Sequence, residues 1–252
     1  EYWDAKGNIF AHQTASDIAI YNKNSQPSMD LAFTSAGKRI PYDAEGIDKS
    51  GAYVSDDAIW YQNTRICSVS DVALLGRHNL QNVCAALAAA WHETQDVSAI
   101  AEAIRTFQGL PYRLQDIRTV NSIRFVNDSI GTTPESTIAA LEAFTEPKVL
   151  ILGGSDKGAS FADMVKRITT SNVSGVVIMG QTGDQILAEL QMAGYPNEQI
   201  KRVDDMSSAV KASQELAEDG GVVLLSPACA SFDMFDSYKD RGEKFNNAVL
   251  AL

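Results

Sequence analysis

The 252-residue chain has the composition of an acidic globular protein. It carries 21 lysines and arginines against 32 aspartates and glutamates, a net charge of −11, and 45% of its residues are hydrophobic. This composition excludes a disordered chain, and the absence of a basic stripe argues against nucleic acid or an anionic membrane as a partner. Three cysteines indicate a reducing, intracellular compartment, and apolar runs such as Val83–Trp91 are too short to cross a bilayer.

The first 75 residues predict one helix followed by a β-rich segment. Aromatic and apolar residues recur at helical spacing over Glu1–Phe10. Short alternating segments separated by turn residues then predict a small antiparallel sheet. Its expected strands are Asp17–Tyr21, Leu31–Phe33, Ala52–Val54, Ala58–Gln62 and Ile66–Val69. Because the chain opens at Glu1, inside a predicted helix, we expect it to be a fragment of a longer protein.

Two helices follow. Asn79 is the expected N-cap of the first, whose apolar residues from Leu80 to Trp91 fall on one face. The second carries Ile100, Ile104 and Phe107 on one side and ends at the Gly109–Pro111 segment. We place a domain boundary there, between residues 110 and 111.

From residue 112 onward, short apolar strands alternate with amphipathic helices. The strands are expected at Ile123–Val126, Val149–Leu152, Gly175–Met179 and Val222–Leu225. The helices are expected from Thr133 to Phe144 and over Phe161–Thr169, Gly183–Ala193, Asp205–Ala217 and Asp236–Leu252. This alternation predicts an α/β fold with a mostly parallel sheet covered on both faces. Ligands of such sheets bind at the carboxyl ends of the strands, where the sequence places polar clusters at Asn127–Thr133, Gly153–Ser160 and Ser226–Ser231.

Each cluster has a structural and a functional interpretation. Gly153 and Gly154 permit a sharp turn, and Lys157 is either solvated or paired with an anionic ligand. Asp128 either starts a turn or accepts ribose hydroxyls. Cys229 is a better candidate for packing than for catalysis, because His12, His78 and His92 all precede the boundary.

Taken together, six motifs resemble the Mur ligases of peptidoglycan synthesis, most closely the members that add D-glutamate. They are Tyr2-Trp-Asp-Ala-Lys6, Gly76-Arg-His-Asn-Leu-Gln-Asn82, Gly109-Leu-Pro-Tyr-Arg113, Phe125-Val-Asn-Asp-Ser129, Leu152-Gly-Gly-Ser-Asp-Lys157 and Leu225-Ser-Pro-Ala-Cys-Ala-Ser-Phe-Asp233. The resemblance implies that residues 1–110 are the C-terminal portion of an ATP-binding central domain. It also implies that residues 111–252 are a Rossmann-like C-terminal domain that binds the incoming amino acid and part of ATP.

The implied activity is an ATP-dependent ligation of D-glutamate to UDP-N-acetylmuramoyl-L-alanine through an acyl phosphate, with Mg²⁺ as the cation. Lys6 matches the lysine that the family carbamylates, which would make it a catalytic residue and an oxygen ligand of Mg²⁺. The remaining matches divide into two groups. The ATP contacts are His78, Asn79, Asn82, Arg113 and Asp128, and the D-glutamate contacts are Thr132, Lys157, Ser231, Phe232 and Tyr238.

Three departures from the family pattern are visible. Ile130 stands where some relatives have lysine, and Tyr238 where the family often has phenylalanine. The UDP-binding domain and the Walker A loop are absent from this chain, so we expect the chain alone to be inactive, and the intact protein to be a cytoplasmic monomer. Two alternatives stay open: a related ligase that adds L-glutamate or polyglutamate, and a non-catalytic Rossmann-like binding module.

Overall fold

Two units make up the chain, one ending at Gln108 and the other beginning at Gly109. The computed structural model describes residues 2–252, with Tyr2 described by its backbone alone. Glu1, the first residue of the first predicted helix, and the Tyr2 side chain therefore lie outside the described part. Within residues 2–252, no helix is both long and apolar enough to span a membrane.

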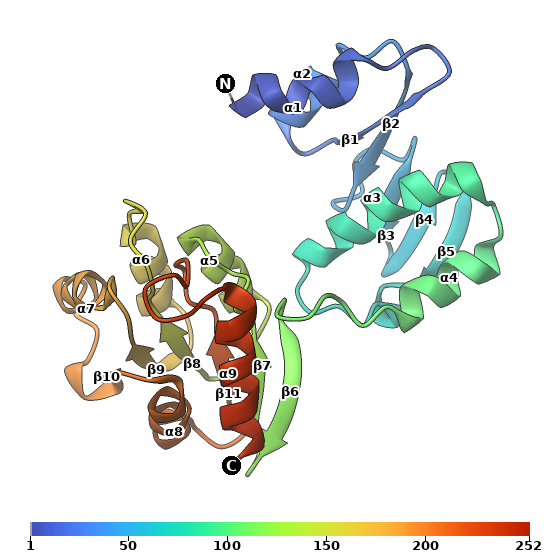
Figure 1. Cartoon of the computed structure of the whole chain (residues 1–252). Coiled ribbons are helices and arrows are strands. Elements are labelled where there is room, and N and C mark those ends of the chain that lie inside the picture. The colour runs from blue at the N-terminus through green and yellow to red at the C-terminus, as the bar shows by residue number, and fades with distance from the viewer. Residues whose placement is uncertain (1) are drawn as a thin grey trace. The chain divides into compact units, whose positions relative to one another are not determined.

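A five-stranded mixed sheet forms the centre of the first unit (Figure 1). Its strands are adjacent in chain order: β1 (Ile18–Asn22), β2 (Lys38–Asp43), β3 (Ala52–Ser55), β4 (Ala58–Tyr61) and β5 (Thr64–Ser68). The first three strands run parallel, and β4 and β5 continue the sheet in antiparallel pairing. The prediction of a wholly antiparallel sheet was therefore wrong for β1 to β3.

The predicted strand Leu31–Phe33 was also wrong, because this segment belongs to helix α2 (Gln26–Ala32). The Ser25 hydroxyl caps this helix by accepting the amide of Ser28, and a proline in the first turn suits a helix start. The buried Ala32 packs with Ala19 and Tyr21 of β1. The hydroxyl cap and the proline thus favour a helix over the strand that a short apolar run suggested.

Three further helices and a short 3₁₀ turn complete the first unit. They are α1 (Tyr2–Ala11), the 3₁₀ turn η1 (Val69–Asp71), α3 (His78–Glu93) and α4 (Val97–Thr106). The apolar face of α3, with Val83, Cys84 and Leu87, packs against Ile59 and Tyr61 of the sheet. The predicted N-cap was wrong, because Arg77 occupies that position and Asn79 is the second residue of the helix.

A six-stranded sheet forms the centre of the second unit (Figure 1), in the spatial order β10-β9-β8-β11-β7-β6. The strands are β6 (Gln115–Val120), β7 (Ile123–Asn127), β8 (Lys148–Leu152), β9 (Val173–Ile178), β10 (Ile200–Arg202) and β11 (Val222–Leu225). All neighbouring pairs are parallel except β6 with β7. The predicted mostly parallel, Rossmann-like sheet is confirmed.

Helices cover both faces of this sheet. They are α5 (Pro134–Glu142), α6 (Ala162–Thr170), α7 (Gly183–Met192), α8 (Met206–Leu216) and α9 (Tyr238–Leu250), with a 3₁₀ turn η2 (Asn197–Gln199) before β10. From β7 to β10 each crossover moves the chain in one direction across the sheet, and α8 returns it to β11 in the opposite direction. Right-handed crossovers then place α5, α6 and α7 on one face and α8 on the other. Residues of α8 and α9 share one buried core with the sheet, including Met206, Val210 and Phe245.

The reversal of direction creates a switch point in the strand order, beside β11. This strand lies between β7 and β8 and is parallel to both. Leu225 pairs with Asn127 on one side and with Ile151 on the other, so the three strands end almost level. In open α/β sheets, such a point is where the loops leave room for a ligand.

Candidate functional site

The three polar clusters meet at this switch point. The loop after β7 contains Asp128 and Thr132, the loop after β8 contains Lys157, and the loop after β11 contains Ser231 and Phe232. Backbone hydrogen bonds connect the loops directly. Three of these bonds are Gly153 N to Pro227 O at 2.9 Å, Ser155 N to Ala230 O at 2.8 Å, and Ala228 N to Gly131 O at 3.1 Å. The clusters therefore form one connected edge of the second unit.

Two glycines allow the loop after β8 to lie this close to its neighbours. Gly153 and Gly154 have φ angles of 111° and 152°, a region that residues with a side chain rarely adopt. A Cβ atom on Gly153 would collide with the Met179 carbonyl oxygen, and one on Gly154 with that of Ala230. The glycine pair is thus required by both backbone conformation and space, and it fixes where the chain continues toward Lys157.

A fourth loop, between β9 and α7, also belongs to this edge and contacts the loop after β8. The Gly154 amide donates to Thr182 Oγ1 at 3.1 Å, and the Asp156 amide donates to Gln181 Oε1 at 3.2 Å. The Gln181 amide in turn donates to Asp233 Oδ2 at 2.8 Å. This loop was not predicted as part of the site, because it carries neither a charged residue nor a Gly-Gly pair.

Asp128 is the buried acid of the edge, with 2% of its surface exposed. Its carboxylate accepts the Ser226 hydroxyl at 2.8 Å and the Leu114 amide at 3.3 Å. Burial raises the pKa of Asp128 to about 6, against the lowering effects of these two hydrogen bonds and of the positive charges of Arg113 and Arg241. One carboxylate oxygen is thus tied to the segment that carries the exposed Arg113.

The other predicted residues of this unit differ in exposure. Ser231 is buried, Thr132 and Tyr238 are partly buried, and Lys157 is exposed to solvent. Phe232 leaves 71% of its surface exposed. Tyr238 is the first residue of α9, and its ring meets that of Tyr112 edge to face at 6.2 Å between centroids.

The first unit holds the remaining predicted residues. Asn79 is buried and donates through Nδ2 to the Leu75 carbonyl at 2.6 Å, and the exposed Asn82 donates to Asn79 Oδ1 at 2.9 Å. His78 begins α3, and Lys6 lies on the exposed surface of α1. The Asn79 side chain thus fixes the turn before α3, and Asn82 stays accessible.

Arg241 is the site component that the sequence analysis missed. This α9 side chain is 1% exposed and is among the largest fully buried side chains in the described part of the chain. It lies four and eight residues before the buried Phe245 and Val249. Its helical phase with these apolar residues was the signal that could have identified it as inward-facing.

Cys229 is a packing residue, in agreement with the interpretation made from the sequence. Its sulfur lies 3.2 Å from Thr182 Oγ1, and burial raises the pKa of the thiol. Cys67 and Cys84 are buried as well, and burial raises the pKa of Cys84 to about 12. A thiol held protonated in this way is a poor nucleophile.

Clusters of acidic, histidine and cysteine side chains are the usual ligands of a protein-bound metal ion. Across residues 2–252, no three or more His, Cys, Asp or Glu side chains gather where they could hold a metal ion. A Mg²⁺ ion that arrives with a nucleotide needs only one or two protein oxygens, because phosphates and water complete its shell.

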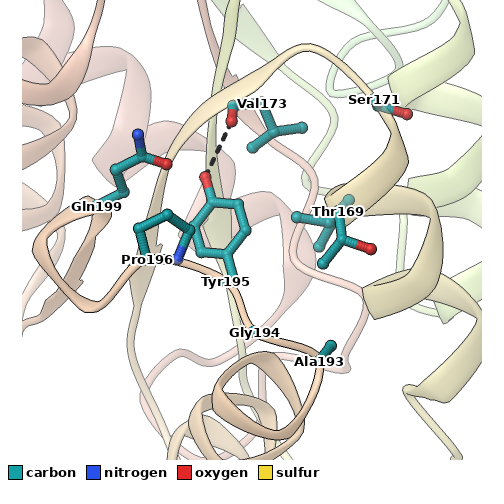
Figure 2. Close-up of a pocket in the computed structure, with 9 residues that line it drawn as sticks. Thr169, Ser171, Val173, Ala193, Gly194, Tyr195, Pro196 and Gln199 are labelled. Atoms are coloured by element: carbon teal, nitrogen blue, oxygen red, sulfur yellow. Dashed lines mark hydrogen bonds between the residues drawn. The ribbon is translucent and has the colours of Figure 1, made fainter.

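Two cavities lie away from the polar edge. One, of about 320 Å³, lies near the start of β9 around Tyr195 (Figure 2). The Tyr195 hydroxyl donates to the Val173 carbonyl at 3.0 Å. This cavity is at the amino end of the strand, opposite the loops described above, and no charged side chain lines it. The other, of about 570 Å³, is an apolar groove between α3 and α4 in the first unit. Neither cavity offers the charged groups of the carboxyl edge.

Comparison with known families divides the chain in two. Residues 1–90 match the Mur ligase middle domain, and residues 112–229 match the Mur ligase glutamate ligase domain. Two relatives are both named UDP-N-acetylmuramoylalanine--D-glutamate ligase. The one from Caldanaerobacter subterraneus subsp. tengcongensis is 37% identical over 251 residues, and the one from Geobacillus kaustophilus is 39% identical over 249 residues.

These matches cover nearly all of this chain but only part of the relatives. The chain is covered to 100% and 98%, whereas the two relatives are covered to 56% and 54%. The chain therefore spans about half the length of the curated relatives it matches.

Solved structures share the fold at low identity. MurF from Acinetobacter baumannii gives a TM-score of 0.72 at 17% identity, covering 99% of this chain and 55% of that one. The folylpolyglutamate synthase of Mycobacterium tuberculosis, complexed with ADP, gives 0.70 at 13% identity, covering 98% and 58%. At such identities the likeness concerns the fold alone.

Proposed function

Because this chain belongs to the Mur ligase family, we propose that the protein containing it is an ATP-dependent ligase that joins D-glutamate to UDP-N-acetylmuramoyl-L-alanine in peptidoglycan synthesis. The identity of 37–39% to relatives of that name, along essentially the whole chain, supports the choice within the family. The observation that carries the chemistry is the convergence of three polar loops beside β11.

The proposed reaction activates a carboxylate before forming the amide. ATP transfers its γ-phosphoryl group to the alanyl carboxylate, which gives ADP and an acyl phosphate. The uncharged amine of D-glutamate attacks the acyl carbon, and the tetrahedral intermediate expels phosphate as the amide forms. A carboxylate resists attack until one oxygen becomes part of a good leaving group, which is the reason ATP is needed.

We assign the amino-acid contacts to the second unit. Lys157 provides a positive charge for a carboxylate of D-glutamate, and Thr132 and Ser231 provide hydroxyls from the two neighbouring loops. The exposed Phe232 and the ring of Tyr238 supply apolar contact for the methylene groups. This assignment explains why Phe232 is left uncovered at a polar edge.

We assign the nucleotide contacts to both units. Asp128 accepts ribose hydroxyls and Arg113 meets a phosphate, while His78, Asn79 and Asn82 meet the adenine side. Lys6, as a carbamate, would offer an anionic oxygen to the Mg²⁺ that accompanies ATP, which neutralises phosphate charge when bound. Residues 1–110 would then be part of the ATP-binding central domain and residues 111–252 the amino-acid-binding domain. We expect the protein to work in the cytoplasm as a monomer.

Substitution of Lys157 tests this function. Lys157→Met keeps the aliphatic stem and removes the ammonium. The KM for D-glutamate should rise about tenfold or more, since a hydrogen bond to a charged group contributes about 1.5–3 kcal/mol and about 1.4 kcal/mol corresponds to a factor of ten. The measurement is D-glutamate-dependent phosphate release from ATP, with UDP-N-acetylmuramoyl-L-alanine, in the full protein that contains this chain.

Lys166→Met, at an exposed lysine of α6 in the same unit, is the matched control and should keep the original KM. The absence of D-glutamate-dependent release in the unsubstituted protein would overturn the proposal. Equal use of L-glutamate would instead favour the related ligase that adds the L-isomer.

A further inference from the structure

Arg241 occupies an unusual position for a charged residue. It lies in the first turn of α9, its side chain is 1% exposed, and it points beneath the loops after β7 and β11. A buried charge costs several kcal/mol of desolvation unless its hydrogen bonds are satisfied. The partners of Arg241 therefore indicate what the side chain contributes.

All four acceptors of the guanidinium belong to the two loops. Nε donates to Ser129 Oγ at 3.0 Å and Nη2 to the Ser129 carbonyl at 2.8 Å. Nη1 donates to the carbonyls of Cys229 at 3.0 Å and Ala230 at 3.3 Å. The planar fork thus bridges residue 129 of one loop and residues 229 and 230 of the other, a geometry that an ammonium cannot reproduce.

No acceptor of Arg241 carries a charge. Among residues 2–252, none of the ion pairs within 4.0 Å includes this arginine. Asp128 and Asp233 act on it through space only. Burial lowers its pKa to about 10, so the group stays protonated at neutral pH. The positive charge is therefore neutralised by no single carboxylate and is directed at the loop backbone.

We propose that Arg241 is a positioning residue that locks the loop carrying Asp128 and Thr132 to the loop carrying Ser231 and Phe232. The two loops also meet at their bases, through Ser226 with Asp128 and Ala228 with Gly131. Arg241 connects the two loops a second time, through Ser129 on one side and the two residues directly before Ser231 on the other. The consequence for ligand binding rests on the proposed function. If that function holds, Arg241 positions both the nucleotide contacts and the amino-acid contacts.

The structural part is tested by hydrogen–deuterium exchange on the chain without ligand. Arg241→Lys keeps the charge but loses the fork, so exchange should rise at least about tenfold in residues 127–133 and 226–235. Strands β8 and β9 should keep their original protection. Arg167→Met, at an exposed arginine paired with Glu142, is the matched control and should leave both loops unchanged.

A second variant separates positioning from general destabilisation. Ser129→Ala removes the acceptor of Nε, and Ser129 makes no hydrogen bond of its own to residues 228–231. If Arg241 couples the loops, this change loosens residues 226–235 as well as 127–133. Faster exchange in residues 127–133 alone, or equal loosening throughout the second unit, would overturn the proposal.

The ligand part is tested in the full protein by steady-state kinetics. Arg241→Lys should raise the KM values of both ATP and D-glutamate by about tenfold or more, whereas Lys157→Met should raise that of D-glutamate alone. Original KM values in a variant whose loops exchange faster would overturn the coupling of the two sites. If the unsubstituted protein shows no ligase activity, the proposed function fails, and the exchange experiment still decides the positioning role.

Discussion

At the scale of single residues, Asp128 shows how the fold adjusts an acid for its surroundings. Its carboxylate is buried at the switch point, and burial outweighs two hydrogen bonds and two nearby arginines, so that its pKa rises to about 6. The folded protein therefore holds this proton more tightly than the unfolded chain, whose aspartates titrate near 4. Ionisation of Asp128 opposes folding.

The sign of the resulting pH dependence follows from this difference. The stabilising contribution of Asp128 is fully present below pH 4 and is lost as the pH rises toward 6. Between pH 4.5 and pH 7.5 the loss amounts to about 2 kcal/mol, on the basis of 1.36 kcal/mol per pKa unit. Asp128→Asn has no proton to lose. Its amide can still accept from Leu114, and the Ser226 hydroxyl has Thr137 Oγ1 as an alternative acceptor.

We therefore expect that the free energy of unfolding of Asp128→Asn does not decrease in this way as the pH rises. Relative to the original protein, the variant should gain about 2 kcal/mol between pH 4.5 and pH 7.5, measured by urea denaturation at both values. Asp163→Asn, at an exposed acid of α6, serves as the control. A difference between variant and original that is the same at both pH values would contradict the prediction.

At the scale of elements, the turn after β8 determines how closely the loops approach. Gly154 combines a φ angle of 152° with a position against the Ala230 carbonyl. Gly158, a few residues later, also has a positive φ angle, but open space surrounds it. Substitutions at Gly154 and Gly158 therefore separate the energetic cost of backbone strain from that of steric collision.

Gly154→Ala should lower the free energy of unfolding by on the order of 3 kcal/mol, because strain and collision add. Gly158→Ala should lower it by only about 1 kcal/mol, the cost of the left-handed conformation. Urea denaturation of both variants at neutral pH measures the difference. Equal losses would show that the loop after β8 can move away from Ala230 at little cost.

The elements also show what the sequence could and could not predict. Buried, almost wholly apolar strands such as β8 and β11 were predicted, because their pattern reflects burial on both faces. The strands β6 and β10 were missed, since both lie at sheet edges and leave many residues exposed. In β2, exposed Lys38 and Arg39 and an internal proline conceal a strand that tertiary pairing stabilises.

The candidate site was also predictable only where the sequence pattern reflects the position in the fold. Clusters that directly follow predicted strands were found at one edge, because parallel strands end on the same side. Arg241 was missed because charged residues are expected at the surface, although its spacing to Phe245 placed it on the buried face. The ligand roles of Thr132, Lys157 and Ser231 stay predictions, and the kinetic experiments on Lys157→Met test that of Lys157.

At the scale of the whole molecule, the two units have separate cores. One core joins α3 and α4 to the first sheet, and another joins α8 and α9 to the second sheet. The second unit begins with a segment that is fixed to its own body, since the Ile130 amide donates to the Tyr112 carbonyl at 3.1 Å. The Tyr112 ring also packs against Gly242 of α9.

Residues 109–252 should consequently fold when expressed alone. We expect a single cooperative thermal transition by circular dichroism and native-like exchange protection in β7, β8 and β11. A broad, non-cooperative transition, or loss of protection in these strands, would show that the second unit depends on the first.

The burial of all three thiols has a practical consequence for labelling chemistry. Maleimides and other alkylating reagents attack thiolates, and Cys67, Cys84 and Cys229 are all shielded and hold their protons more firmly than a free cysteine. The native chain should therefore remain largely unmodified under conditions that label a surface thiol within minutes. A fluorophore attached through Phe232→Cys would then be the single reporter on the molecule, placed at the carboxyl edge of the second sheet.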